Sequence, residues 1–184
     1  MKFICKFILS IFGWKVKPFS FKELNKFIII SAPHTSNWDF IIGRIALSVY
    51  QVKAKFMIKK ELFFFPLNLI LKWLGAIPVD RKNAINVVDQ VVDIYNKQES
   101  FVIIITPEGT RKLVKSWKKG FYQIAIKAQI PIVLNCIDYG KKEIGFETIF
   151  YPTGDFEKDI QTIQNYYKGK IARYPENYNL TNKN

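Results

Sequence analysis

The sequence is poor in the residues that build metal and disulfide sites. It contains one histidine and two cysteines, Cys5 and Cys136, which lie far apart in apolar runs. Two distant cysteines do not form a disulfide framework, and one histidine without a cysteine pair does not form a zinc site. We therefore predict a protein without a bound metal ion.

Several common catalytic motifs are absent as well. The sequence has no G-x-S-x-G elbow, no P-loop and no G-x-G-x-x-G turn. Serine hydrolases of the α/β type, P-loop NTPases and dinucleotide-binding enzymes are recognised by these motifs. The sequence therefore offers no support for any of these three classes.

Acidic residues are scarce relative to basic ones. There are 15 Asp and Glu against 28 Lys and Arg, which gives a formal net charge of +13, and 49% of the residues are hydrophobic. Positive charge combined with high apolar content favours an anionic partner, either a membrane surface or a nucleic acid. The 184 residues suffice for one domain with a sizeable core.

Residues 1–17 predict an amphipathic helix that lies in a membrane interface. The helix is too short to span a bilayer, and Lys6 interrupts the apolar core that a signal peptide would need. Lysines on one face would lie near anionic headgroups. The alternative is a helix packed on the protein core. The apolar residues at helical spacing are Phe3, Ile4, Phe7, Ile8, Ile11 and Phe12.

The most apolar stretch, residues 62–74, approaches the length of a membrane span. Pro66, Asn68 and Lys72 argue against a continuous span. The sequence leaves open whether residues 62–79 enter the bilayer or form core.

Strands and helices alternate along the rest of the chain. Apolar β-branched runs predict strands at 27–30, 101–105 and 130–137, and helical periodicity marks 40–50, 87–95, 117–128 and 156–167. This alternation predicts an α/β fold: a single domain over 18–174 with a mostly parallel mixed sheet flanked by helices. Residues 175–184 are expected to form a polar C-terminal tail.

The single histidine, His34, lies in the turn between the strand at 27–30 and the helix that follows. Asp39 comes five positions later. Ligands of open α/β sheets bind at such strand-to-helix turns. Histidine is suited to proton abstraction near neutral pH, and a carboxylate can orient its ring. The N-terminus of the following helix is expected to supply N–H donors for a developing negative charge. The alternative is a loop histidine near an unrelated aspartate.

Further candidates follow other predicted strands. Arg81 and Arg111 can each bind a phosphate or carboxylate through two hydrogen bonds. Glu108 can accept a bond from a hydroxyl or orient an arginine, and Gly109 permits close approach of backbone to a ligand. Plainer alternatives are a surface salt bridge for Arg81 and an ordinary turn at 108–110, including Thr110. The lysines around Lys119 form either a headgroup-binding patch or a solvated face.

Four blocks, in order, resemble the glycerolipid acyltransferase family, specifically its lysophosphatidic acid (1-acylglycerol-3-phosphate) acyltransferase-like group. The resemblance covers about residues 25–140 and departs from the family's usual residues at Pro33, Thr106 and Lys112. The blocks are His34–Asp39 (H-x4-D), Gly75–Arg81, Pro107–Arg111 (P-E-G-T-R), and Trp117–Gly120 followed by Ile130–Val133.

The resemblance implies transfer of a fatty acyl group from an acyl thioester to a lysophospholipid-type acceptor, with 1-acylglycerol-3-phosphate expected, in phospholipid biosynthesis. It implies that His34 and Asp39 are catalytic and that Arg81, Glu108, Gly109, Thr110, Arg111 and Lys119 bind substrate. Acyl-CoA or acyl-carrier protein is then the donor, and no further cofactor is expected. We expect a peripheral or monotopic protein on the cytoplasmic face of the cell membrane, bound to anionic lipids and not to nucleic acid.

Two other functions stay open at this point. A hydrolase of lipids or thioesters can use the same His/Asp pair, and it differs from a transferase by not requiring an acceptor. A non-catalytic basic protein that binds membrane or nucleic acid explains the charge, but it leaves residues 107–111 unexplained.

Overall fold

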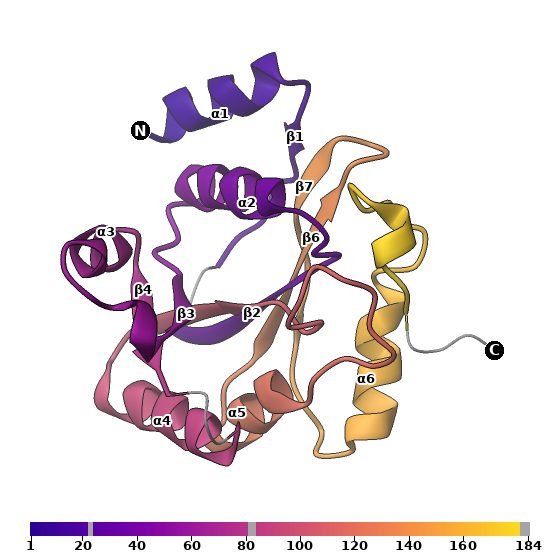
Figure 1. Cartoon of the computed structure of the whole chain (residues 1–184). Helices are drawn as coiled ribbons and strands as arrows, with labels where there is room; N and C mark the ends of the chain where they lie inside the picture. Colours follow the sequence, from indigo (N-terminus) through magenta and orange to yellow (C-terminus); the bar gives the residue numbers. More distant parts are fainter. Residues whose placement is uncertain (22–23, 81–83, 181–184) are drawn as a thin grey trace.

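The computed structural model describes residues 1–21, 24–80 and 84–180, apart from the side chains of residues 84–86. Its centre is a seven-stranded sheet in the order β1-β7-β6-β2-β5-β3-β4, with helices on both faces (Figure 1). Every neighbouring pair of strands is parallel except β6 and β7, which are antiparallel. The predicted α/β domain with a mostly parallel mixed sheet is therefore confirmed.

In chain order the elements are α1 (Lys2–Ile11), β1 (Lys15–Val16), β2 (Lys26–Ala32), α2 (Asn37–Tyr50), β3 (Lys55–Lys59), η1 (Lys60–Leu62), α3 (Leu67–Trp73), β4 (Ala76–Val79), α4 (Ala84–Lys97), β5 (Phe101–Ile105), α5 (Gly120–Ala128), β6 (Ile132–Asp138), β7 (Glu143–Phe150), α6 (Phe156–Asn165) and η2 (Pro175–Asn177).

The continuous apolar run of β2 is explained by its place in the middle of the sheet, where both faces are covered. Ile28 and Ile30 point into the core formed with α4, α5 and α6, whereas Phe27 and Ile29 point into a second core that includes Leu47 of α2. Successive side chains of a strand alternate between the two faces, so the run Phe27–Ile30 is apolar at every position. The turn that carries His34 is thereby fixed at the carboxyl end of a central, buried strand.

The N-terminal segment differs from the predicted helix over 1–17. Helix α1 ends at Ile11, Gly13 adopts φ +76°, and β1 then joins the sheet beside β7. Leu9 and Trp14 are buried against α2 and β7, while Phe3 and Phe7 are exposed. The helix therefore packs on the core through one face and presents a second apolar face outward.

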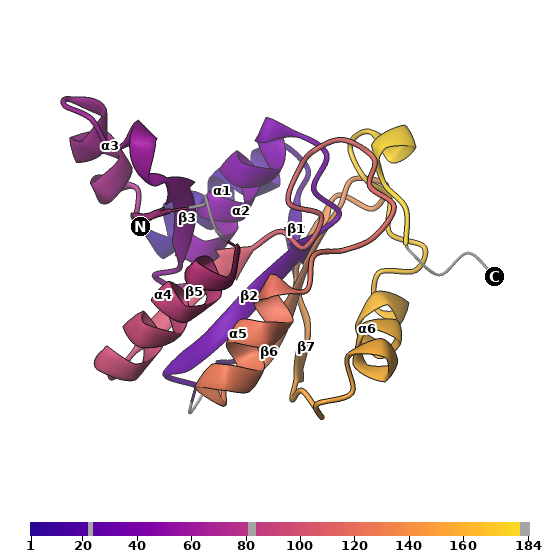
Figure 2. The same cartoon turned by 60° about the horizontal axis from the view of Figure 1, so that its bottom comes forward.

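The apolar stretch at 62–74 is not core. Within α3 only Leu71 is buried, while Phe65 is 78% and Trp73 84% exposed. Helix α3 projects from a corner of the molecule (Figure 2). By contrast, Ala76 and Val79 of β4 are buried, so residues 62–79 divide into an exposed apolar part and a sheet strand.

The C-terminal segment also differs from the expected polar tail over 175–184. Residues 175–177 form η2, and Tyr178 and Leu180 pack against the core that lies under α4 and α5. Residues 181–184 lie outside the described part of the chain. The aromatic and apolar side chains at 178 and 180 explain why this segment stays on the protein.

Candidate active site

The candidate site lies where three adjacent parallel strands end. In the sheet β2 lies between β5 and β6, and the three strands run in the same direction. The loop after β2 carries His34 and the loop after β5 carries Glu108, while Tyr139 directly follows β6. Carboxyl ends of parallel strands meet at one edge of a sheet, which is where ligands of such folds bind.

His34 and Asp39 are brought together as the sequence predicts. The imidazole Nδ1 of His34 lies 3.2 Å from Oδ2 of Asp39. The side chain of Asp39 is 3% exposed, whereas that of His34 is 21% exposed and accessible to a substrate. With Nδ1–H directed at the carboxylate, Nε2 of the neutral ring is left as the base.

Asp39 is held by a dense set of donors. Its Oδ2 accepts backbone hydrogen bonds from Thr35 and Ser36, each at 2.8 Å. Burial raises the pKa of Asp39, but hydrogen bonds from His34, Tyr139 and the Ser36 backbone outweigh it, so the pKa falls below its ordinary value of 3.8. Asp39 therefore stays ionised and can stabilise an imidazolium on His34.

The expectation that the N-terminus of α2 offers free N–H donors is not met at three positions. Asp39 and Ser36 form a reciprocal capping box at the start of the helix. The N–H groups of Thr35 and Ser36 bond to Asp39, and the N–H of Trp38 bonds to Ser36 Oγ. These three N–H groups are occupied by the cap of the helix, and two of them hold the Asp39 carboxylate in place.

Glu108 contacts the dyad loop through the backbone. Its Oε1 accepts a hydrogen bond of 3.1 Å from the N–H of His34, and the residue is 4% exposed. Burial is the main reason that the pKa of Glu108 rises to about 8, and the charge of Asp39 adds to the rise. Burial therefore favours the protonated form of Glu108 near neutral pH, and in this form the carboxyl group can also donate a hydrogen bond.

Residues 109–111 of the P-E-G-T-R stretch face solvent, whereas Pro107 is buried. Gly109 has φ +68°, a backbone conformation that favours glycine, and its nearest neighbour is the flexible end of the Lys118 side chain. Thr110 and Arg111 are exposed, and Thr110 Oγ1 accepts a bond from the N–H of Lys112. Substrate binding by these residues stays a prediction.

Lys119 contacts helix α6 and not the dyad. Nζ of Lys119 lies 3.1 Å from Glu157 and 4.3 Å from the centre of the Phe156 ring, so its described contacts are with α6. Arg81 lies outside the described residues.

Two residues that the sequence analysis missed also lie at the dyad. The Tyr139 hydroxyl donates a 2.6 Å hydrogen bond to Oδ1 of Asp39. The Arg173 guanidinium lies 5.8 Å from the ring centre of Tyr139 and 5.5 Å from that of Trp38. A signal for Tyr139 was available, because it lies two positions after the end of the predicted strand at 130–137. Arg173 lies on an irregular segment with no comparable signal.

Comparison with known proteins identifies the family of the chain. A family model described as Acyltransferase matches residues 19–137. The chain belongs to the acyltransferase family. The matched region contains His34, Asp39 and Glu108, whereas Tyr139 and Arg173 lie beyond its end.

Two individual proteins are similar to this chain. Human 1-acyl-sn-glycerol-3-phosphate acyltransferase beta is 27% identical over 146 residues, which cover 68% of this chain and 51% of that protein. The chain thus spans about half the length of this curated relative. The crystal structure of PlsC, the 1-acyl-sn-glycerophosphate (LPA) acyltransferase from Thermotoga maritima, matches with a TM-score of 0.60 and 18% identity. That match covers 90% of this chain and 74% of PlsC, and it supports the same fold.

Proposed function

We propose that this protein transfers a fatty acyl group from acyl-CoA or acyl-carrier protein to the hydroxyl of 1-acylglycerol-3-phosphate or a closely related lysophospholipid. The observation that carries the proposal is the His34–Asp39 pair, with Nδ1 bound to a buried carboxylate and the ring edge accessible. Family membership and the names of both relatives support the reaction class and the acceptor.

In the proposed reaction Nε2 of His34 accepts the proton of the acceptor hydroxyl, and the oxygen of that hydroxyl attacks the carbonyl carbon of the thioester. A C–O bond forms, the C–S bond breaks, and the proton passes from the imidazolium to the departing thiolate. Asp39, which is buried and ionised, stabilises the imidazolium in between. Arg111 and Arg81 are the proposed ligands of the acceptor phosphate.

The test is acyl transfer by the purified protein to lysophosphatidic acid, with acyl-CoA and acyl-carrier protein compared as donors. We expect thiol release that depends on the acceptor and a diacyl product. His34→Ala should reduce the rate by about 10²–10⁴-fold, the usual contribution of general-base catalysis. Thiol release at the same rate without acceptor would support the hydrolase instead, and a folded His34→Ala protein with normal turnover would refute the dyad mechanism.

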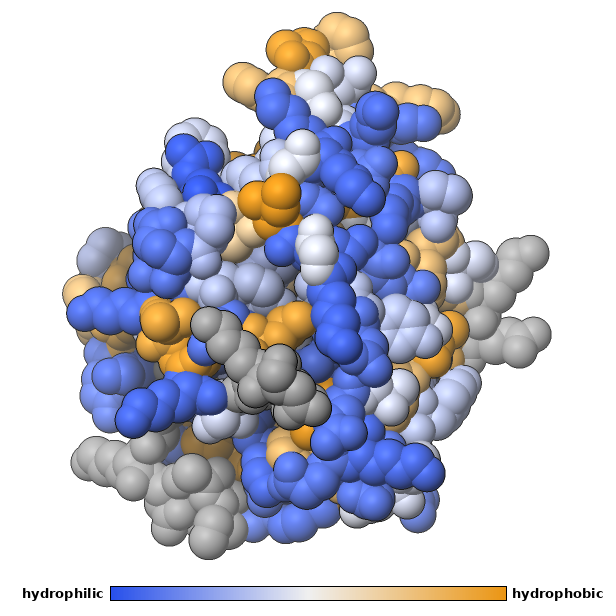
Figure 3. Space-filling view, turned by 90° about the vertical axis from the view of Figure 1, so that its right-hand side faces the viewer, coloured by the Kyte–Doolittle hydropathy of each residue, from blue (hydrophilic) through white to orange (hydrophobic). Residues whose placement is uncertain are grey.

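We further propose that the protein is monotopic and binds the membrane through α1 and α3. Both helices expose large apolar side chains, and hydrophobic residues gather at the top edge in Figure 3, on the side where α1 lies in Figure 1. No helix in the described ranges is long and apolar enough to cross a bilayer. The exposed apolar residues are Phe3, Ile4, Phe7, Ile11 and Phe12 of the N-terminal segment and Phe64, Phe65, Leu69, Ile70 and Trp73 around α3.

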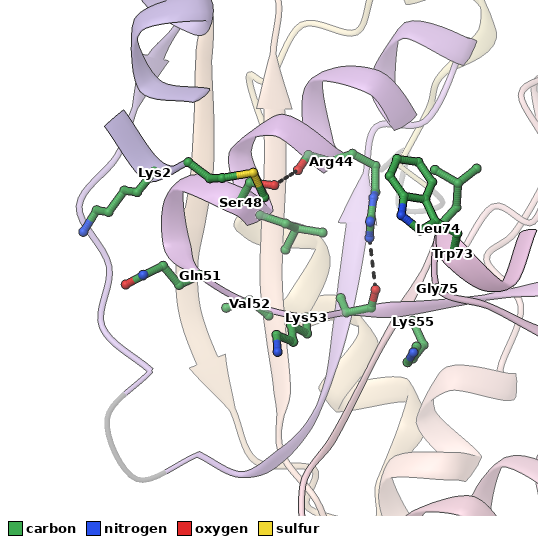
Figure 4. Close-up of a pocket in the computed structure, with 13 residues that line it drawn as sticks. Lys2, Arg44, Ser48, Gln51, Val52, Lys53, Lys55, Trp73, Leu74 and Gly75 are labelled. Atoms are coloured by element: carbon green, nitrogen blue, oxygen red, sulfur yellow. Dashed lines mark hydrogen bonds between the residues drawn. The ribbon is translucent and has the colours of Figure 1, made fainter. Parts of the chain in front are cut away.

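A basic cavity of about 430 Å³ between these two helices supports a preference for anionic lipid. Lys2, Lys53 and Lys55 line it together with Arg44, and none of its described lining residues is acidic (Figure 4). Arg44 is half-buried and donates to the Ala54 carbonyl. The cavity lies at the opposite end of α2 from the dyad, and a 14-residue helix is about 20 Å long, so it is separate from the catalytic groups.

Vesicle co-sedimentation with two charge-matched double variants tests this proposal. Lys53→Gln with Lys55→Gln should weaken binding to anionic vesicles by about 30-fold, since each basic residue near the surface contributes about 1 kcal/mol. Lys127→Gln with Lys158→Gln removes the same charge from α5 and α6 and should have little effect. Equal losses would refute a specific basic site, and a wild-type protein that stays in the supernatant at low salt would refute membrane binding. The cytoplasmic face stays a prediction.

A further inference from the structure

Asp39 is bound through both of its carboxylate oxygens, and the second oxygen has a tyrosine as its partner. Oδ2 is near His34, while Oδ1 accepts the 2.6 Å hydrogen bond from Tyr139. The two residues are 100 positions apart in the chain and meet because β2 and β6 are neighbours in the sheet.

The backbone around Tyr139 is fixed by the segment that carries Arg173. The N–H of Tyr139 donates to the Ile171 carbonyl at 2.9 Å. The buried Asp138 carboxylate accepts bonds from the N–H groups of Gly140, Lys141 and Ile171. The turn after β6 and the segment at 171–174 are thereby joined. The same segment reaches the dyad loop, because the N–H of Tyr174 donates to Thr35 Oγ1.

The ring of Tyr139 is held by two further side chains. Trp14 packs against it in a T-shaped arrangement, with ring centres 5.0 Å apart and an interplanar angle of 85°. Arg173 lies 5.8 Å from the same ring centre. Trp14 belongs to the N-terminal segment that carries α1, so this segment contacts the dyad through a single intervening residue.

We propose that Tyr139 is a positioning residue of this enzyme, which holds Asp39 in the orientation that directs His34 at the acceptor hydroxyl, and that Trp14 keeps Tyr139 in place. The proposal rests on the function proposed above. The hydrogen bond fixes the carboxylate against rotation and favours its ionised form, since a short bond to a charged acceptor is stronger than one between neutral groups. His34, Glu108 and Arg173 are the other titratable or charged groups that face this cluster.

Tyr139→Phe tests the proposal because it removes one oxygen atom and leaves the ring. We expect kcat to fall about 10-fold with little change in KM for either substrate, as is usual for loss of a hydrogen bond to a charged group. The pKa of Asp39 should rise, because Tyr139 no longer donates a hydrogen bond to its carboxylate. Trp14→Ala should reproduce both changes in weaker form.

Tyr95→Phe is the matched control. Its hydroxyl donates a 2.7 Å bond to the Phe27 carbonyl, so this variant also loses one short tyrosine hydrogen bond to the β2 region without touching the dyad. We expect it to lower the melting temperature but to leave kcat unchanged. If Tyr139→Phe changes only the melting temperature, or if both variants lower kcat equally, the positioning role is wrong.

A measurement without turnover separates this proposal from the proposed function. The protein has one histidine, so the imidazole C–H signals in its NMR spectrum belong to His34 alone. Oδ2 of Asp39 lies 3.2 Å from Nδ1 of His34, so ionisation of Asp39 should produce an inflection at low pH in the chemical shifts of these signals. We expect Tyr139→Phe to move that inflection to higher pH and Tyr95→Phe to leave it unchanged. An unmoved inflection in Tyr139→Phe would refute the inference, whereas an inactive enzyme with a moved inflection would refute only the proposed function.

Discussion

Glu108→Gln should make the protein more stable at alkaline pH, because the wild-type carboxyl group is buried where ionisation is unfavourable. Glu108 is 4% exposed, its Oε2 has no hydrogen-bond partner among the residues that the structure describes, and burial raises its pKa from 4.5 to about 8. Glutamine has the same shape and keeps a carbonyl oxygen for the His34 N–H, but it does not ionise.

The magnitude follows from proton linkage. Between pH 4.5 and 8 the unfolded chain has released the Glu108 proton while the folded protein retains it. The folded state therefore binds more protons, and its stability falls by about 1.4 kcal/mol per pH unit over this interval. The stabilisation from Glu108 is fully present below pH 4.5 and lost by about pH 8, which amounts to roughly 4–5 kcal/mol. Small domains are stable by about 5–15 kcal/mol in total, so the effect is measurable.

The assay is urea unfolding of both proteins at pH 4.5, 6, 7.5 and 9. We expect the stability of Glu108→Gln relative to wild type to rise steadily from pH 4.5 to 8 and then level off. The difference in free energy of unfolding between the two proteins does not contain the contributions of other titrating groups whose pKa the substitution leaves unchanged. A difference that stays constant with pH would show that Glu108 has an ordinary pKa and would refute the argument from burial.

Three further outcomes are expected. Asp39→Asn should lower kcat as strongly as His34→Ala in an enzyme that still folds, because a neutral amide does not stabilise the imidazolium; near-normal kcat would contradict this. Arg111→Ala should raise KM for the acceptor more than KM for the donor, with partial rescue by lysine, which lacks the fork geometry; equal increases would point to a structural role. Phe7→Ser with Ile11→Ser should weaken vesicle binding but spare activity on a detergent-soluble acceptor, since both side chains are exposed while Leu9 and Trp14 keep α1 packed. This pair is a cleaner test than deleting residues 1–14, because deletion would also remove the contact of Trp14 with Tyr139.

The local sequence was sufficient for much of the fold and for half of the site. Apolar β-branched runs such as 101–105 predict strands through their composition alone. The pair of His34 and Asp39 forms within one turn, because Asp39 and Ser36 also make the capping box of the helix that follows. The ends of α1 and the packing of residues 175–180 were not predictable in the same way. Whether Leu9, Tyr178 or Leu180 is buried depends on surfaces that belong to distant elements.

The sequence by itself determined the dyad, the strand ends that carry it and the positive charge of the chain, because each depends on residues close together or on composition. Only the tertiary structure placed Tyr139 and Arg173 at the dyad and Trp14 against Tyr139. It also decided the environment of Glu108, whose burial raises its pKa to about 8. Hydrogen-bond partners 100 residues apart and the solvation of a carboxyl group are properties of the packed sheet, and no local pattern in the chain encodes them.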